Sequence, residues 1–195
     1  MIIHIELENR NKVKRFIREI FNCPRPGIFL AGGAARSLIT NEEVVDYDLF
    51  FASAEIAEKF EKDLLMCSKA QVKYRCPAGE LVTIMWDNKY KIQLIKKTYH
   101  PTPENLVERF DFTICKFAVD MADFSIHYAE ADAYDAHNRI LRVNNIQYPV
   151  ATLHRVKKYL DKGYRPSDWQ WFWEDIIKRT SKIELTDENL ALYID

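Results

Sequence analysis

The chain is short of glycine, cysteine and net charge, and each shortage excludes a class of protein. Five glycines and seven prolines among 195 residues leave no low-complexity tract and no long linker. A formal net charge of −1 provides no general attraction to nucleic acid or anionic membranes, so a polynucleotide contact would need a local patch. No apolar run reaches the length of a membrane span.

The cysteines are far apart and form no CxxC pair, which predicts reduced thiols of a cytoplasmic protein rather than a disulfide framework or a zinc site. They are Cys23, Cys67, Cys76 and Cys115. The first residues become polar by Glu6, which argues against a signal peptide. We therefore expect a cytoplasmic protein without a membrane partner.

What the chain does contain is enough apolar surface for a sizeable core, with 48% hydrophobic and 13% aromatic residues. The apolar spacing predicts an α+β protein. Expected helices are 8–21, 33–39, 54–67, 104–108 and 152–162, one opening at Ser167 with Gln170 as a capping box, and 188–194 with Thr186 as its cap. Expected strands are 28–31, 47–51 and 71–75, a hairpin of 81–86 with 90–95, and a second hairpin of 111–120 with 124–128, whose first segment could instead begin a helix. We divide the chain into a core with its N-terminal helix, 1–148, and a small helical extension packed on it, 149–195.

Two short elements stand out along this core. The apolar run that ends at Ala31 is followed by Gly32 and Gly33 and then by a helix. Glycines allow a backbone to approach an anion closely, and a helix N-terminus favours negative charge. Downstream, Asp46 and Asp48 flank Tyr47, and on a strand they would project from the same face. Neighbouring carboxylates repel each other unless a cation lies between them. A phosphate cradle beside a divalent-cation site is what metal-assisted phosphoryl or nucleotidyl transfer needs.

Three blocks of sequence resemble one known family. Residues 32–39 followed by 46–49 resemble the signature GGxVRDxLLG…DxDL, residues 109–118 resemble RRDFTINALA, and residues 153–159 are similar to the LRxxRF helix. These blocks belong to the head domain and neck of bacterial poly(A) polymerases and CCA-adding tRNA nucleotidyltransferases, members of the DNA polymerase beta-type superfamily. The resemblance covers about residues 26–162. It implies a nucleotidyltransferase fold, in which helices flank a mixed central sheet.

The resemblance also assigns roles by position. It implies that Gly32, Gly33 and Arg36 contact the phosphates of a bound nucleotide. It implies that Asp46 and Asp48 bind Mg²⁺ or Mn²⁺, with two ions that clamp the triphosphate and activate the attacking hydroxyl. Arg109 matches the first arginine of the second block and is expected to bind the nucleotide. Asp111 matches its aspartate, which lies near the ribose in the family and is expected to support catalysis.

The chain departs from the family pattern at several functional positions. Ser37 and Phe110 replace an acidic residue and an arginine of the two signatures. Gln93 occupies the expected position of a third carboxylate on the neighbouring strand, and a neutral amide cannot act as an anionic ligand or base. The base-selecting EDxxR element should fall near residues 148–152, which contain neither its aspartate nor its arginine. The family's long neck, body and tail helices, which hold tRNA, are absent from this sequence.

Purely structural explanations exist for each of these features. The glycine pair alone is more typical of a tight strand-to-helix turn, and Arg36 could be a surface helix residue. Arg109 could pair with Glu108 or Asp111. In residues 169–176, helical spacing places Trp169, Phe172, Trp173 and Ile176 on one stripe, which favours a packed core, whereas Trp171 lies off the stripe as a candidate exposed contact.

The sequence thus supports two hypotheses from different classes. The first is a metal-dependent nucleotidyltransferase that moves a nucleoside monophosphate from an NTP to the hydroxyl of an RNA 3′ end, a small molecule or a protein, with a possible role in RNA processing. The second is a catalytically inactive relative that keeps the fold for nucleotide binding, regulation or interaction. The replacements at Gln93 and Phe110 motivate the second hypothesis.

Overall fold

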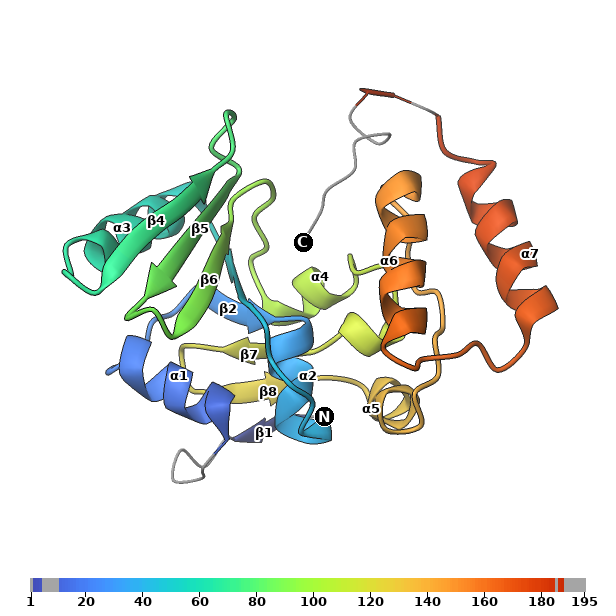
Figure 1. Ribbon diagram of the computed structural model, residues 1–195, viewed down its shortest axis with the longest axis horizontal. Helices are drawn as coiled ribbons and strands as arrows, with labels where there is room; N and C mark the ends of the chain where they lie inside the picture. The colour runs from blue at the N-terminus through green and yellow to red at the C-terminus, as the bar shows by residue number, and fades with distance from the viewer. Residues whose placement is uncertain (1, 5–10, 185, 188–195) are drawn as a thin grey trace.

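One mixed sheet organises the structure, a computed structural model that describes residues 2–4, 11–184 and 186–187 (Figure 1). In the described residues the sheet has eight strands, and β3 and β6 pair in parallel while the other neighbours are antiparallel. Their spatial order is β1 (Ile2–His4), β8 (Ser125–His127), β7 (Ala118–Asp120), β2 (Ile28–Ala31), β3 (Tyr47–Phe51), β6 (Tyr90–Ile95), β5 (Leu81–Trp86) and β4 (Ala70–Arg75). The helices are α1 (Lys12–Ile20), α2 (Gly33–Thr40), α3 (Ala54–Leu65), α4 (Pro103–Val107), α5 (Glu130–His137), α6 (Pro149–Asp161) and α7 (Trp169–Thr180), with a 3₁₀ turn at Thr113–Cys115. This architecture confirms the predicted α+β class and the helix-flanked mixed sheet.

Side-chain alternation along β3 separates the two faces of the sheet. Tyr47, Leu49 and Phe51 are buried on the face covered by helices α1, α2 and α3, where they join the main hydrophobic cluster. Asp48 and Phe50 therefore project from the opposite face. Phe50 packs there with a smaller cluster that includes Leu106 of α4. One face of the strand thus provides the core, and the other carries the polar residues of the candidate site.

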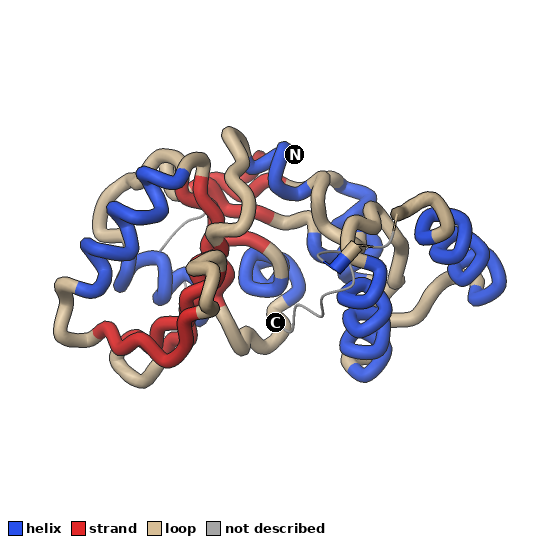
Figure 2. The backbone as a smooth tube through the Cα atoms, turned by 90° about the horizontal axis from the view of Figure 1, so that it is seen from above, coloured by secondary structure: helices blue, strands red, loops and turns tan. Residues whose placement is uncertain are grey.

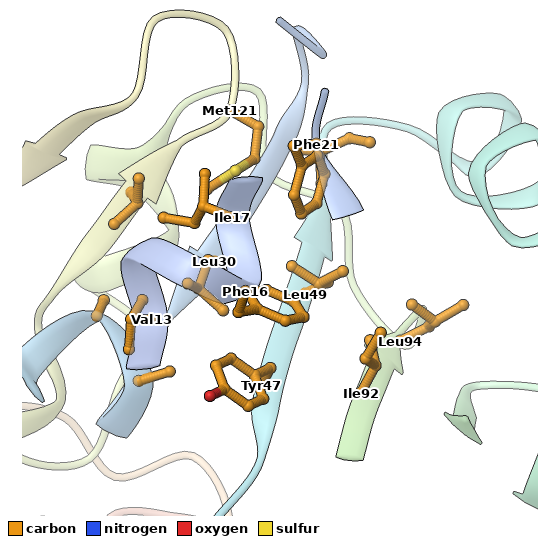
Figure 3. Packing of buried hydrophobic residues seen from close by; sticks show 14 of the residues in the cluster. Val13, Phe16, Ile17, Phe21, Leu30, Tyr47, Leu49, Ile92, Leu94 and Met121 are labelled. Carbon is orange, nitrogen blue, oxygen red and sulfur yellow. The ribbon is translucent and has the colours of Figure 1, made fainter. Parts of the chain in front are cut away.

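Helix α1 packs its apolar face against β3 in the hydrophobic core. Asn11 caps its N-terminus, since the Asn11 side chain accepts a hydrogen bond from the Val13 N–H at 2.8 Å. Figure 3 shows Phe16 of this helix lying against Tyr47, and their ring centroids are 4.0 Å apart in a stacked arrangement. Val13, Phe16 and Ile17 are fully buried, as the helical spacing of the sequence predicts.

A second hydrophobic cluster lies beneath α6 and α7, which stand beside the sheet rather than on it (Figures 1 and 2). Its members come from the segment around the 3₁₀ turn, from the loop before α6, from the two helices and from the segment between them. They are Phe112, Ile114, Cys115, Leu141, Val143, Ile146, Val156, Tyr159, Tyr164, Phe172 and Ile176. The division of the chain at residue 148 stays a prediction, because this cluster takes residues from both sides of it.

Most predicted elements agree with the structure, but the hairpin predicted for 111–120 with 124–128 is only partly correct. Its pairing is confined to β7 and β8, and the segment before β7 forms the 3₁₀ turn. Phe112 and Ile114 enter the second cluster instead of a ladder. Strand β1 and helix α5 were not predicted. The predicted helix at 188–194 lies outside the described residues.

For α7, the predicted cap is wrong and the predicted apolar stripe is only partly correct. Asp168, not Ser167, caps the helix, and its carboxylate accepts the Trp171 N–H at 2.8 Å. Of the expected apolar stripe, Phe172 and Ile176 are buried, whereas Trp169 and Trp173 are 45% and 39% exposed. The second cluster contacts a narrower strip of the helix than the sequence spacing indicates. Trp171 is exposed, as predicted.

The described helices include none that is long and apolar enough to cross a membrane.

Gly27, just before β2, offers a stability test because its backbone has φ of +78° and a Cβ there would lie 2.6 Å from Ile56 Cδ1. Gly79 is the matched control, with φ of +73° and open space around it. Both substitutions to alanine strain the backbone. We expect Gly27→Ala to lower the free energy of unfolding by about 1 kcal/mol more than Gly79→Ala, since Ile56 must also repack. Urea denaturation measures the difference, and equal losses would contradict it.

Glu61 of α3 provides a test of how stability depends on pH, because it pairs with Arg75 of β4 and with Lys96, the residue that follows β6. Its carboxylate accepts hydrogen bonds from Lys96 Nζ at 2.6 Å and from Arg75. Burial raises the pKa of Glu61, but Lys96 and Arg75 outweigh it and hold the pKa below its ordinary value of 4.5. A lowered pKa stabilises the fold above pH 4.5, and this contribution is lost as the pH falls below that value.

In Glu61→Gln we therefore expect a smaller loss of stability between pH 6 and pH 3, about the range where the carboxylate gains its proton. Thermal unfolding at a series of pH values measures it. Glu58→Gln, an exposed change on the same helix, is the control. If Glu61→Gln lost stability with falling pH as the wild type does, the contacts of Glu61 with Lys96 and Arg75 would contribute nothing to the pH dependence.

Candidate functional site

The turn between β2 and α2 forms one wall of the candidate site. Gly32 has φ of +71°, a conformation that favours glycine, and its N–H donates to the Phe117 carbonyl oxygen at 3.0 Å. This geometry starts α2 at Gly33, next to β3. A Cβ on Gly32 would lie 3.9 Å from Asp48 Oδ2, so the turn passes close to the carboxylate. The N-terminus of α2, whose first amides have no acceptor within the helix, therefore begins beside Asp48.

Asp48 lies on β3, and Tyr47 is buried on the opposite face, as the strand alternation predicts. Asp48 pairs in register with Ala31 of β2, and its Oδ1 atom is shielded from solvent. Asp46 immediately precedes the strand, and its Oδ2 lies 3.7 Å from the ammonium of Lys91. The ammonium of Lys91 thus lies in part of the space beside Asp46 that a metal ion bound to this carboxylate would need.

A polar row extends from Asp48 across the sheet. Asp48 is in register with Gln93 of β6, and Gln93 is in register with Thr83 of β5. Residues in register project from the same face. The structure therefore places Gln93 directly beside Asp48, at the position where the family resemblance implies a third carboxylate. Gln93 and Thr83 are both buried, and neither can carry negative charge here.

Arg36 lies inside the protein rather than on the helix surface, with 2% of its surface exposed. Its Nε and Nη2 donate to Glu42 Oε2 at 3.2 and 2.9 Å, and its Nη1 donates to the Ile114 carbonyl oxygen at 2.7 Å. The guanidinium also faces the rings of Tyr159 and Tyr164, at 5.7 and 5.5 Å from their centroids. Phosphate binding by Arg36 stays a prediction, and it would require the guanidinium to exchange Glu42 for the nucleotide.

The charge state of this pair follows from its surroundings. Burial alone would lower the pKa of Arg36, but its neighbours Tyr159, Tyr164, Cys115 and Glu42 raise it overall. Burial raises the pKa of Glu42, but Arg36 and the Tyr164 hydroxyl outweigh it and bring the pKa below its ordinary value. Arg36 and Glu42 are therefore a charged pair at neutral pH.

Asp111 and Arg109 occupy different environments. Asp111 is buried and accepts a hydrogen bond from Arg155 Nη1 of α6 at 2.7 Å, so it connects the core to the helical part. Arg109 is exposed and lies close enough to His100 to lower the pKa of that imidazole, although burial lowers it more. Glu108, a candidate structural partner of Arg109, forms an ion pair with Lys116 at 2.9 Å. The side chain of Arg109 remains accessible to an anionic ligand.

The donor set suits a magnesium ion that arrives with a nucleotide. Mg²⁺ in phosphoryl-transfer sites is held by one or two carboxylates together with substrate phosphates and water. Asp48 provides a carboxylate beside a helix N-terminus, and Asp46 precedes it by two residues in the chain. Nowhere in the described part of the chain are three or more histidine, cysteine, aspartate or glutamate side chains grouped to hold a metal by themselves. The residues present therefore fit a metal shared with phosphates better than an all-protein cage.

Sequence reasoning missed three residues that shape this site, namely Lys91, Glu42 and Tyr164. Lys91 could have been found from the sequence, because it lies two residues before Gln93 on a predicted hairpin strand and therefore projects from the same face. Glu42 and Tyr164 form a hydrogen bond although they are 122 residues apart. Their sequence carries no signal of this contact.

Comparison with solved structures assigns the fold. A structure described as a tRNA-processing enzyme (apo form I) has a TM-score of 0.64 and 17% identity, over 92% of this chain and 49% of that chain. The Thermotoga maritima CCA-adding enzyme complexed with tRNA has a TM-score of 0.60 and 15% identity, over 93% of this chain and 46% of that chain. A CCA-adding enzyme in complex with ATP has a TM-score of 0.60 and 16% identity, over 87% of this chain and 41% of that chain. The chain has the fold of tRNA nucleotidyltransferases and spans about half or less of their length.

Comparison at the level of sequence identifies a narrower family. A protein of Bacillus phage SPbetaL7 named Gabija anti-defense 2 is 31% identical over 162 residues, which are 80% of this chain and 38% of that protein. The family described as "Gabija anti-defense 2 family protein" matches residues 7–139, a range that contains the Gly32 turn, Asp46, Asp48 and Asp111. The chain, folded like the catalytic head of a tRNA nucleotidyltransferase, belongs to the Gabija anti-defense 2 family.

Proposed function

We propose that the chain acts against Gabija as a metal-dependent nucleotidyltransferase, moving a nucleoside monophosphate from an NTP to a hydroxyl acceptor. The observation that carries this proposal is the position of Asp48, a strand carboxylate beside the Gly32 turn and the N-terminus of α2. A carboxylate that can hold a metal, beside helix amides that can bind phosphate, suits a metal-bound triphosphate. The fold shared with ATP-bound and tRNA-bound CCA-adding enzymes supports the same reaction class.

In this proposal each part of the site has a separate task. The amides at the start of α2 and the exposed Arg109 bind the phosphates, and Asp46 and Asp48 hold the metal. When bound, Mg²⁺ or Mn²⁺ supplies positive charge that neutralises the triphosphate and makes the acceptor hydroxyl easier to deprotonate. Asp111, held by Arg155 at 2.7 Å, supports the nucleotide from the side of α6. Pyrophosphate leaves as the new phosphodiester bond forms.

The acceptor is the least constrained part of the proposal. The solved relative that holds tRNA is about twice the length of this chain, since the match covers 46% of it. The polar row of Asp48, Gln93 and Thr83 leads away from the metal site along the sheet, and it offers hydrogen bonds but no positive charge for a phosphate backbone. The family name points to a target within a defence system. We therefore favour a protein hydroxyl as the acceptor, ahead of an RNA 3′ end or a small molecule.

A second candidate function is binding without catalysis, and Gln93 is the observation that favours it. This buried amide lies beside Asp48 in register, where a third carboxylate would complete an acidic triad. Two carboxylates hold a metal less firmly than three, and an amide cannot accept a proton from the acceptor. In this alternative the chain opposes Gabija by holding a nucleotide or a partner protein.

Asp48→Asn separates these functions. The change keeps the shape of the side chain but removes its charge, so we expect nucleotidyl transfer to fall by about 100-fold or more. The measurement is transfer of label from each α-labelled NTP, with Mg²⁺ or Mn²⁺, to Gabija components and to RNA. Asp87→Asn, in the exposed β5–β6 turn, is the control and should transfer at the wild-type rate.

Equal transfer by wild type and folded Asp48→Asn would contradict the catalytic proposal. If wild type transfers no label but an NTP raises its melting temperature in the presence of Mg²⁺, the binding function is supported instead.

Lys91→Met tests whether the lysine competes with metal at Asp46. Removing an ammonium 3.7 Å from the carboxylate eliminates an attraction of about 1 kcal/mol in water, so Mn²⁺ should bind about fivefold more tightly. Calorimetric titration of Mn²⁺ without nucleotide measures the affinity. Lys59→Met, an exposed change on α3, is the control. Unchanged or weaker Mn²⁺ binding in Lys91→Met would exclude competition.

A further inference from the structure

Glu42 is held from two sides by residues of different parts of the chain. Arg36 of α2 donates two hydrogen bonds to Glu42 Oε2, and the Tyr164 hydroxyl donates to Glu42 Oε1. Both carboxylate oxygens are therefore engaged. Tyr164 is 1% exposed and follows Gly163, the glycine with φ of +87° that ends α6. The contact joins the helical part of the chain to the loop that enters the candidate site.

That loop leads directly to the metal-binding aspartates. Helix α2 ends at Thr40, Asn41 takes a left-handed conformation with φ of 57°, and β3 begins at Tyr47. Between them, residues 42–46 belong to no helix or strand. The path of this segment, and with it the position of Asp46, therefore depends on side-chain contacts rather than on a backbone ladder. Val44 packs on the main hydrophobic cluster, and Glu42 adds charge-assisted hydrogen bonds, which are stronger than neutral ones.

Arg36 itself is fixed independently of Glu42. Its Nη1 donates to the Ile114 carbonyl oxygen at 2.7 Å, and its guanidinium lies over the Tyr159 and Tyr164 rings. The Tyr159 hydroxyl in turn lies 3.0 Å from Cys115 Sγ. The anchor for Glu42 thus lies against two rings of the second hydrophobic cluster.

We propose that Arg36 and Tyr164 form a clamp on Glu42 that positions Asp46 for metal binding. This inference rests on the proposed function, because it assigns the clamp a task in the metal site. In it Arg36, the arginine of the glycine-rich signature, is a positioning residue rather than a phosphate ligand. The helical part of the chain then takes part in the metal site through Tyr164, without itself contacting the metal.

Tyr164→Phe tests the clamp because it removes only the hydroxyl and keeps the ring against Arg36. We expect Mn²⁺ affinity to fall by about tenfold, the typical effect of losing a residue that orients a metal ligand. Tyr134→Phe, which removes an exposed hydroxyl on α5, is the matched control and should leave Mn²⁺ affinity unchanged. Titrations are made well below the melting temperature of each variant, so that overall stability does not enter the comparison.

Hydrogen exchange of the amides of residues 42–46 provides the second measurement. The clamp predicts faster exchange of this segment in Tyr164→Phe, with unchanged exchange in β2 and β3. Faster exchange together with wild-type Mn²⁺ affinity would overturn the positioning role. Unchanged exchange would overturn the clamp itself. If wild type binds no Mn²⁺ even when an NTP is present, the metal-dependent function fails, and the exchange result alone decides whether the clamp orders the loop.

Discussion

The buried charge of Arg36 is the constraint around which the two parts of the chain are arranged. A guanidinium with 2% of its surface exposed is tolerated only when its donors are satisfied and its charge is balanced. Glu42 provides the balancing charge, the Ile114 carbonyl oxygen accepts a further hydrogen bond, and the guanidinium carbon lies over the rings of Tyr159 and Tyr164. These partners come from the loop of residues 42–46, from the 3₁₀ turn, and from α6 and the residues that follow it. All three segments must therefore meet for the hydrogen bonds and the charge of Arg36 to be satisfied.

The candidate site depends in turn on the alternation of β3. The same strand buries Tyr47 and Leu49 beneath α1 and α2 and presents Asp48 on the opposite face. Its parallel pairing with β6 determines what lies next to that carboxylate, namely the amide of Gln93. The fold that this chain shares with tRNA nucleotidyltransferases thus places an amide beside the carboxylate that we propose binds the metal, where the family resemblance implies a third carboxylate. This difference is why catalysis and nucleotide binding remain separate hypotheses for a Gabija anti-defense 2 family protein.

Much of the fold was predictable because its signals are local. Apolar spacing identified α1 and the β5–β6 hairpin, and the glycine pair identified the turn from β2 into α2. Helix α5 gave no such signal, because its buried residues include Asp132 and Asp135 instead of an apolar stripe. Asp135 accepts hydrogen bonds from Thr113 at 2.8 Å and from Arg142 at 2.9 Å. A helix stabilised by distant polar partners cannot be identified from the periodicity of its own residues.

By itself the sequence determined that Asp48 lies on the face of its strand opposite Tyr47 and where the chain turns into a helix, since backbone geometry sets both over a few residues. Only the tertiary structure decided that Arg36 faces Glu42 inside the protein, that Lys91 lies beside Asp46, and that Tyr164 reaches a carboxylate 122 residues away. The reason is physical: a repeating pattern records the conformation of one segment, whereas the partner of a charged side chain depends on which segments pack together around it.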